Sequence, residues 1–220
     1  MIRVAVSGSG SMGATVLAAV EAEEDMEAVG VVEPLGGPET LTSLSGASYP
    51  LSDDPVSLFE ATKPDVVVDF TNAQFTPRLI DAALAAGVRP VIGTSGITAE
   101  MTEDLRARCA QAQRGAVIAS NFALGAVVLM HLAQVAAPYF EAVEVIELHH
   151  SGKVDAPSGT ALETARLMRA ARGSDFDHPE PELTHIDGTR GGVEGGVGLH
   201  SVRLPGLVAR GIDHTAVLRP

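Results

Sequence analysis

The chain has 220 residues, enough for one large domain or two smaller ones with a buried core. Its 15 Lys and Arg and 28 Asp and Glu give a formal net charge of −13 at pH 7, which argues against nucleic-acid binding because that needs clustered cations facing phosphates. There is no run of roughly 18 apolar residues and no signal-peptide pattern, and the single cysteine allows no intramolecular disulfide, so we expect a cytoplasmic protein without membrane contact.

The first half of the chain alternates between strand and helix patterns. Short β-branched or apolar runs predict strands, at residues 2–6, 27–32, 65–69, 90–92 and 116–119. Helices are predicted between them, at 12–23, 77–86 and 99–113. The first should bury one face with Met12, Val16, Leu17 and Val20, and Cys109 should be a core residue of the last. This alternation is typical of a doubly wound parallel sheet with helices on both faces.

The pattern changes after Phe122. Helices are predicted at 124–136 and 159–171 and a strand at 142–150, followed by a polar stretch and Gly-rich short strands up to about residue 218. We therefore predict a Rossmann-like α/β domain at 1–122. A smaller α+β domain with one helix and several strands should follow at 123–220.

A glycine-rich turn follows the first predicted strand and reads G-x-G-x-x-G, with Gly8, Gly10 and Gly13. Gly8 permits a tight turn, Gly10 lets the backbone approach a pyrophosphate, and Gly13 allows close packing of helix on strand. Glu33 lies at the end of the next strand, where a carboxylate accepts hydrogen bonds from an adenosine ribose. The alternative is an ordinary turn with a solvated Glu33.

Two further loops follow predicted strands of the same sheet. Asp69-Phe70-Thr71 and Gly93-Thr94-Ser95-Gly96 occupy positions where ligands collect in doubly wound folds. The small residues of the second loop could press its backbone against a flat ring. Routine strand-to-helix turns are the alternative.

The densest chemistry lies in the segment ELHHSGKVDAPSGTA, residues 147–161. Strand alternation places His149 and His150 on opposite faces, and Lys153 is close enough in sequence to share a pocket with either. Thr160 and Glu163 fit a capping box, which would leave helix amides for a carboxylate. Surface histidines and a solvated lysine are the alternative. A metal site is disfavoured because no third ligand has familiar spacing.

The motifs GSGSMG, DFTN, GTSG, ASNFALG, ELHHSGKVDAPSGTA and RGGVEGGVGLHSVRLPG occur in this order across residues 2 to 217. Together they resemble the 4-hydroxy-tetrahydrodipicolinate reductase (dihydrodipicolinate reductase) family. The resemblance implies reduction of a cyclic unsaturated dicarboxylate by NADH or NADPH in lysine and diaminopimelate biosynthesis. It also implies a substrate domain with a mixed open sheet, through which such enzymes form homotetramers.

The resemblance also implies site residues. His149 and Lys153 look like the catalytic pair, and which of them donates the proton stays open. Substrate binding is expected from His150, Lys153, Ser158, Gly159 and Thr160. Cofactor binding is expected from Gly8, Gly10, Ser11, Met12, Gly13, Glu33, Phe70, Thr71, Gly93, Thr94, Ser95, Ser120, Asn121 and Phe122.

Two departures from the family pattern alter these expectations. Ser11 stands where similar proteins often carry Arg for the 2′-phosphate of NADPH, so Ser11 with the acidic Glu33 predicts a preference for NADH. Family members also continue with another strand and helix where this chain ends at Pro220. That difference keeps open a non-catalytic NAD(H)-binding sensor or an inactive shortened relative. Another small-substrate dehydrogenase on the same plan is a further alternative.

Overall fold

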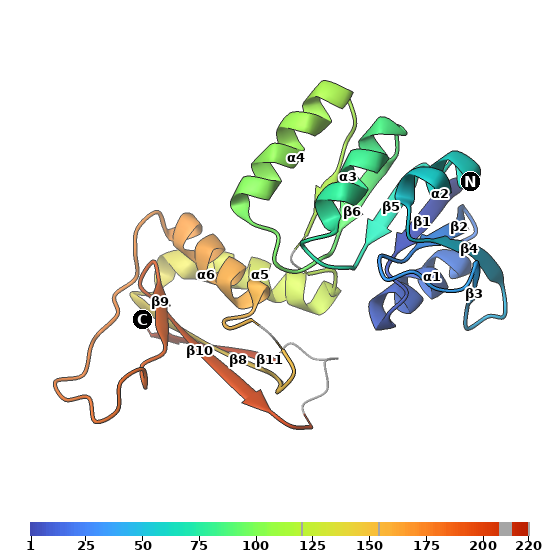
Figure 1. The fold of residues 1–220 in the computed structure, drawn as a ribbon. Coiled ribbons are helices and arrows are strands. Elements are labelled where there is room, and N and C mark those ends of the chain that lie inside the picture. The colour runs from blue at the N-terminus through green and yellow to red at the C-terminus, as the bar shows by residue number, and fades with distance from the viewer. Residues whose placement is uncertain (120, 154, 207–212, 220) are drawn as a thin grey trace. The chain divides into compact units, whose positions relative to one another are not determined.

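The computed structural model describes residues 1–119, 121–153, 155–206 and, as backbone alone, 213–219. The chain divides into two compact units, residues 1–119 and 120–220. Each unit has its own sheet and its own apolar core (Figure 1).

The first unit is built on a seven-stranded sheet in the order β3-β4-β2-β1-β5-β6-β7. The strands are β1 (Ile2–Ser7), β2 (Met26–Val32), β3 (Thr40–Thr42), β4 (Ser48–Ser52), β5 (Val66–Asp69), β6 (Arg89–Ile92) and β7 (Val117–Ile118). All neighbours pair in parallel except β3, which runs antiparallel at one edge. The chain starts at β1, moves outward through β2 and β4, and returns to β5 on the other side. The predicted doubly wound sheet is confirmed, and its switch point lies between β1 and β5, where such folds bind ligands.

The helices of this unit are α1 (Ser11–Ala22), α2 (Pro55–Thr62), α3 (Thr76–Ala85) and α4 (Ala99–Ala112). The main core joins strand residues to helix residues, with Val32 and Val67 packed against Phe59 and Leu79. Strands covered on both faces need apolar side chains at successive positions, which explains the β-branched runs. Cys109 is buried in a second cluster, as predicted, and burial raises the pKa of its thiol.

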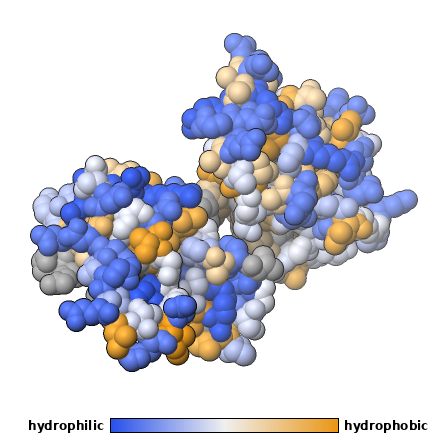
Figure 2. All heavy atoms as spheres, turned by 60° about the vertical axis from the view of Figure 1, so that its left-hand side comes forward, coloured by the Kyte–Doolittle hydropathy of each residue, from blue (hydrophilic) through white to orange (hydrophobic). Residues whose placement is uncertain are grey.

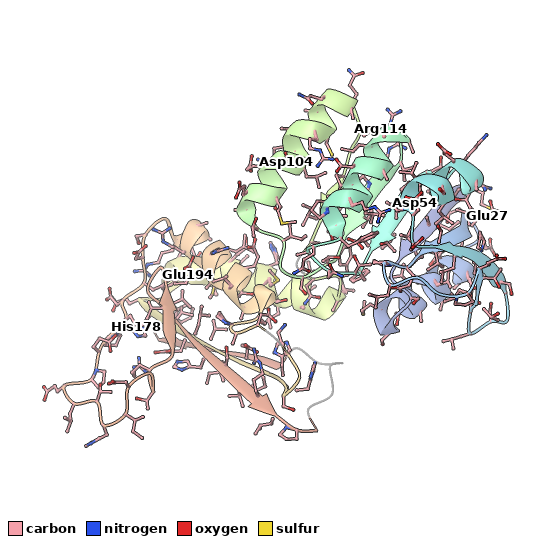
Figure 3. The ribbon with its side chains drawn as sticks, viewed as in Figure 1. Glu27, Asp54, Asp104, Arg114, His178 and Glu194 are labelled. Atoms are coloured by element: carbon pink, nitrogen blue, oxygen red, sulfur yellow. The ribbon has the colours of Figure 1, made fainter. Side chains whose placement is uncertain are left out.

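The sequence prediction missed the short elements between β2 and β5. Strands β3 and β4 have three and five residues, too few for a clear period. Helix α2 has eight residues and begins after Asp54, whose carboxylate accepts from the Ser57 amide at 3.1 Å and hydroxyl at 2.6 Å (Figure 3). This N-cap is the signal that the sequence offered.

The buried face of α1 also differs from the prediction. Met12 is 47% exposed and Val16 is only partly buried. The buried residues are Gly13, Leu17 and Val20, spaced four and three apart. Gly13 faces the glycine-rich loop, and a Cβ at that position would overlap the Gly8 carbonyl. Only glycine therefore lets the helix approach the loop so closely.

The second unit holds a four-stranded mixed sheet in the order β11-β8-β10-β9. Its strands are β8 (Ala142–His150), β9 (Gly192–Glu194), β10 (Val197–Leu204) and β11 (Asp213–Arg219). Strand β8 pairs in parallel with β10 and antiparallel with β11, so the predicted mixed sheet is confirmed.

Helices α5 (Leu124–Ala136) and α6 (Gly159–Arg172) cover one side of this sheet, with a short 3-10 turn at Ala137–Tyr139 (Figure 1). Val143 and Val145 of β8 share a core with Ala165 and Met168 of α6 and Ala133 of α5. The unit therefore packs two helices on the sheet, at the two ranges predicted from the sequence, although the α+β domain had been described as having one helix.

Polar residues dominate the visible surface, with apolar residues in small patches (Figure 2). Within the described part of the chain, no helix combines the length and the apolar character needed to cross a bilayer.

Candidate functional site

The glycine-rich loop closes the carboxyl end of β1. Gly8 has a φ of +102°, a backbone conformation that favours glycine, and its amide donates to the Val32 carbonyl at 2.8 Å. The loop leads into α1 at Gly10, which caps the helix without a side chain. Amides at such a helix start can face an anion.

An open cleft lies at this switch point. It is lined by the glycine-rich loop, by the turn after β2 and by the loop after β5, with residues Gly8, Ser9, Gly10, Glu33, Pro34, Leu35, Gly36, Phe70, Thr71 and Asn72. Five of the predicted cofactor residues thus meet in one cleft: Gly8, Gly10, Glu33, Phe70 and Thr71. Its walls combine glycine backbone and small polar side chains with the apolar side chains of Pro34, Leu35 and Phe70, a mixture that suits a nucleotide.

Glu33 is tied to the glycine-rich loop. Its Oε2 accepts from the Ser9 amide at 2.8 Å and from the Ser9 hydroxyl at 2.6 Å, and Oε1 accepts from the Leu35 amide at 3.2 Å. Partial burial by itself would raise the pKa of Glu33, but the hydrogen bonds from Ser9 and Leu35 outweigh it and lower that pKa. Glu33 is therefore an anion at the cleft. Sequence reasoning missed Ser9, although its hydroxyl between two motif glycines was visible.

Asp69 holds the two loops after β5 and β6. It is fully buried, and its Oδ1 accepts from the Thr71 amide at 3.2 Å and hydroxyl at 2.7 Å. Its Oδ2 accepts from the hydroxyls of Thr76 at 2.7 Å and Thr94 at 2.9 Å. The Thr94 hydroxyl also accepts from the Thr71 amide at 3.1 Å, so both loops depend on this carboxylate. The sequence analysis placed Asp69 at the strand end without giving it this role.

The other predicted cofactor residues do not line this cleft. Ser11 and Met12 are exposed in the first turn of α1, and Gly13 is buried against the loop. Gly93, Thr94 and Ser95 follow β6, where Thr94 is buried and Ser95 is exposed. Asn121 and Phe122 belong to the second unit, and Ser120 lies outside the described residues.

In the second unit, Glu147 and His149 lie on the helix-covered face of β8. Glu147 is fully buried, and its Oε2 is hydrogen-bonded to His149 Nδ1. Arg203 of β10 reaches the same carboxylate with both terminal nitrogens, at 2.8 and 3.0 Å. The sequence analysis gave Glu147 and Arg203 no role. Arg203 belongs to the motif RGGVEGGVGLHSVRLPG, but only the pairing of β10 with β8 brings it to Glu147.

His150 is the last residue of β8, and Lys153 lies just beyond the turn that follows it. The Lys153 ammonium pairs with the Asp155 carboxylate at 2.6 Å, and its amide donates to the His150 carbonyl at 3.2 Å. A Cβ at Gly152 would come within 3.2 Å of His150 Nδ1, so glycine leaves room for that ring. The two predicted histidines thus end β8 and point to opposite faces of the strand, and Lys153 follows them in the loop, where it pairs with Asp155.

The start of α6 differs from the predicted capping box. Ser158 is the N-cap, and its hydroxyl accepts from the Ala161 amide at 3.2 Å. Thr160 lies inside the first turn and its hydroxyl accepts from Asn121 Nδ2 at 3.2 Å. Thr160 is therefore wrong as the capping residue. Ser158 lies immediately before the first helical residue, so its hydroxyl can accept from the third helical amide, whereas Thr160 is already inside the helix.

A second ionic cluster lies on the opposite face of β8. Glu144 accepts from Arg190 at 2.6 Å and is bonded to His200 Nε2 at 2.5 Å. His178, in the loop between α6 and β9, approaches Glu144 at 4.0 Å (Figure 3). Among the described residues, no group of three or more His, Cys, Asp or Glu side chains is arranged to hold a metal ion.

Comparison with known proteins identifies relatives over the whole chain. Residues 2–122 match the family model of the dihydrodipicolinate reductase N-terminus, and residues 125–218 match that of its C-terminus. The 4-hydroxy-tetrahydrodipicolinate reductase of Lysinibacillus sphaericus is 45% identical over 214 residues, covering 94% of this chain and 80% of the relative. The Geobacillus kaustophilus enzyme of the same name is 43% identical over 213 residues, with the same coverage.

Comparison with solved structures also identifies a dihydrodipicolinate reductase. A dipicolinate-bound dihydrodipicolinate reductase from a Paenisporosarcina species is 36% identical with a TM-score of 0.73, covering 99% of this chain and 87% of that one. A scyllo-inositol dehydrogenase from Lactobacillus casei has a TM-score of 0.63 at 12% identity, covering 100% and 72%, and shows the fold alone. Both halves and the relatives agree, so the chain belongs to the dihydrodipicolinate reductase family.

Proposed function

We propose that this chain is an NAD(P)H-dependent oxidoreductase that reduces 4-hydroxy-tetrahydrodipicolinate to tetrahydrodipicolinate in lysine and diaminopimelate biosynthesis. Membership of the family supports the reaction over another dehydrogenase activity. The observation that carries the assignment is the end of β8, where His149 is hydrogen-bonded to Glu147 and Glu147 accepts from the Ser158 amide at the start of α6. The Lys153 ammonium follows in the next loop, and an acidic protein needs such local positive charge to hold a dicarboxylate.

The residues of the first unit fit a dinucleotide. The backbone of Gly8 to Gly10 and the start of α1 would face the pyrophosphate, and Glu33 would accept from the adenosine ribose hydroxyls. Phe70, Thr71 and the loop Gly93–Ser95 would lie toward the nicotinamide, with Asp69 fixing their backbones. When bound, the dinucleotide supplies the hydride.

The substrate carboxylates would bind at the start of α6. The first intrahelical bond runs from the Leu162 amide to the Ser158 carbonyl, and the Ala161 amide is taken by the Ser158 hydroxyl. The amides of Gly159 and Thr160 are the groups that a carboxylate could accept from. His150 and Lys153 would add positive charge on the same side.

Proton transfer completes the reduction. A ring that receives hydride gains electron density at a neighbouring atom, which a nearby cation stabilises and an acid quenches. His149 and Lys153 are the two candidates for this acid. The Lys153 ammonium is paired with the Asp155 carboxylate.

We also propose that NADH is preferred to NADPH. Two observations support this: Glu33 is an anion at the cleft, and Ser11 offers no positive charge to a 2′-phosphate. Titration of each cofactor by fluorescence should give NADH a dissociation constant at least about tenfold lower, since one unfavourable charge pair costs about 1.4 kcal/mol or more. The Ser11→Arg variant should narrow this gap. Equal or tighter binding of NADPH by the unaltered chain would contradict the preference.

A cytoplasmic homotetramer is the proposed state of the protein. The sheet face opposite α5 and α6 carries Ile146, Leu148 and Val202, which are only partly buried within the unit and could pair with another copy. Sedimentation velocity at micromolar concentration should give the mass of four chains. A stable monomer would contradict this assembly.

The reaction is tested by following NADH oxidation when the substrate is generated in the cuvette from pyruvate and aspartate semialdehyde by its synthase. The unaltered chain should turn over, and His149→Gln and Lys153→Ala should each lose about a hundredfold or more in kcat. Both variants should still bind NADH. Tight NADH binding without turnover by the unaltered chain would favour the non-catalytic NAD(H)-binding alternative.

A further inference from the structure

We propose that Glu147, clamped by Arg203, is a positioning residue that holds His149 with its proton on Nδ1 and leaves Nε2 as the nitrogen that exchanges a proton with the substrate. The tautomer follows from contacts within the second unit. The use made of Nε2 rests on the proposed function. Nothing in the family comparison assigns a role to Glu147 or Arg203.

The position of Glu147 in the sheet buries its carboxylate in the apolar core, which costs folding free energy. Strand alternation places Glu147 and His149 on the same face as Val143 and Val145, which are buried in the apolar core. Glu147 is fully buried, and a buried carboxylate without partners is strongly destabilising. A glutamate at this position therefore needs specific partners to be tolerated.

The partners surround both oxygens of the carboxylate. Arg203 Nη2 donates to Oε1 at 2.8 Å and Nη1 donates to Oε2 at 3.0 Å, the two-pronged geometry that makes such pairs strong. The Ser158 amide, at the start of α6, donates to Oε1 at 3.1 Å. His149 Nδ1 completes the set at Oε2. Glu147 therefore cannot turn without breaking four hydrogen bonds.

Arg203 is itself held in register. In the parallel ladder Arg203 of β10 lies opposite His149 and Ser201 lies opposite Glu147, so the guanidinium reaches back along β8 to the carboxylate. Its Nη2 also donates to the Asp155 carbonyl at 2.6 Å, in the loop that carries Lys153. The clamp thus links two strands, the start of α6 and the catalytic loop.

The charge of Glu147 decides the tautomer of His149. Burial raises the pKa of Glu147, but hydrogen bonds from Arg203, Ser201, His149 and the Ser158 amide outweigh it and lower that pKa to about 2. At neutral pH the carboxylate has no proton to donate. The Nδ1–H of His149 must therefore be the donor in their hydrogen bond.

The consequence for the reaction is a fixed route for the proton. When His149 acts as the acid it is an imidazolium, its Nε2–H bond breaks, and the electron pair stays on Nε2. The proton goes to the atom of the substrate that gained electron density from the hydride. The neutral ring that remains still carries its Nδ1 proton and still donates to Glu147, so no rearrangement is needed before solvent returns a proton to Nε2.

Nitrogen-15 NMR of the histidine rings tests the tautomer without any turnover. The His149 signals are assigned by their loss in His149→Gln. At a pH where the ring is neutral, they should show a protonated Nδ1 and an unprotonated Nε2 in the unaltered chain. In Glu147→Gln the amide can donate to Nδ1, so the tautomer should invert. A protonated Nε2 in the unaltered chain would overturn the proposal, whether or not Glu147→Gln folds.

Steady-state kinetics separates positioning from a purely structural role. Glu147→Gln should lower kcat about a hundredfold while the KM for NADH changes less than about twofold, because the groups proposed to bind the dinucleotide lie mainly in the first unit. Glu144→Gln is the matched control, since Glu144 is on the same strand and bonds an arginine and a histidine on the other face. It should leave kcat within about threefold of the unaltered value. Loss of kcat in Glu144→Gln as large as in Glu147→Gln would contradict a specific role for Glu147.

The two proposals fail in different ways. If the unaltered chain reduces no substrate but His149 carries its proton on Nδ1 and inverts in Glu147→Gln, the proposed function fails and the positioning of the ring stands. If the chain is active and Glu147→Gln keeps kcat within threefold, the reductase assignment stands and the positioning role fails.

Discussion

Asp69 in the first unit and Glu147 in the second are both fully buried carboxylates near the carboxyl end of a parallel strand, but they have different partners. Asp69 accepts only from neutral donors, the hydroxyls of three threonines and one backbone amide. Glu147 accepts from a guanidinium and an imidazole as well as from one amide and the Ser201 hydroxyl. The neutral donors around Asp69 fix the shape of two loops. The ionic clamp of Glu147, Arg203 and His149 also fixes which nitrogen of His149 carries a proton.

The same contrast separates the two units. The cleft at the switch point of the first unit includes the glycine-rich loop, whose packing depends on close approach of backbone at Gly8 and Gly13. The end of β8 is formed by charged and titratable side chains, so its properties depend on protonation. Changes in the first unit should therefore alter binding and folding, and changes in the second should alter kcat and its dependence on pH.

The largest effect is expected from Gly13→Ala. The new Cβ would overlap the Gly8 carbonyl, so the loop or α1 must move, and overpacking of this kind costs about 1–3 kcal/mol or more. NADH affinity should fall at least about tenfold, and the unfolding midpoint should drop, measured by fluorescence titration and by thermal unfolding. Gly10→Ala is the control for folding, because a Cβ there meets nothing within 4 Å. Equal stability of the two variants would show that close approach is not what Gly13 provides.

Asp69→Asn should give a smaller effect of the same kind. The amide nitrogen would face a donor, and a buried group left without its partner costs about 1–3 kcal/mol. Because the loops after β5 and β6 would lose their shared anchor, the KM for NADH should rise about tenfold while kcat changes less. Steady-state kinetics with each substrate varied in turn measures this split. A loss confined to kcat would contradict the division between the units.

The sequence predicted those features whose signals are local. The glycine-rich loop, β8 and α6 each lie within a short segment, and their bounds agree with the structure to within a residue or two. The fold class and the family could be predicted for the same reason, since the motifs follow one another in order.

The sequence could not predict contacts that depend on topology. Arg203 is 56 residues from Glu147 along the chain, and only the parallel pairing of β10 with β8 joins them. Asp69 likewise meets Thr94 through the pairing of β5 with β6. The capping box failed for a different reason, because Ser158 and Thr160 are both capping residues by type and the local backbone decides between them.

The smallest expected effect is a difference in acid stability, which the pairing of Glu147 with Arg203 and His149 should cause. The pKa of Glu147 is about 2 in the folded protein against 4.5 for the free group, so this carboxylate stabilises the fold above about pH 4.5. Its contribution is lost as the pH falls from about 4.5 toward about 2, because the unfolded chain then binds a proton that the folded chain does not.

Glu147→Gln removes this titration, so the free energy of unfolding should depend less steeply on pH in the variant. Between pH 5 and pH 3 the unaltered chain should lose on the order of 1 kcal/mol more than the variant, measured by urea unfolding at each pH. Glu144→Gln offers the comparison on the other face of β8, where the pKa of the carboxyl is lowered through His200 and Arg190 although partial burial opposes it. Because Glu144 is only partly buried, its variant should flatten the dependence less. Parallel pH profiles for the unaltered chain and Glu147→Gln would mean that the hydrogen bonds from Arg203, His149 and Ser158 do not lower the pKa of Glu147 in the folded protein.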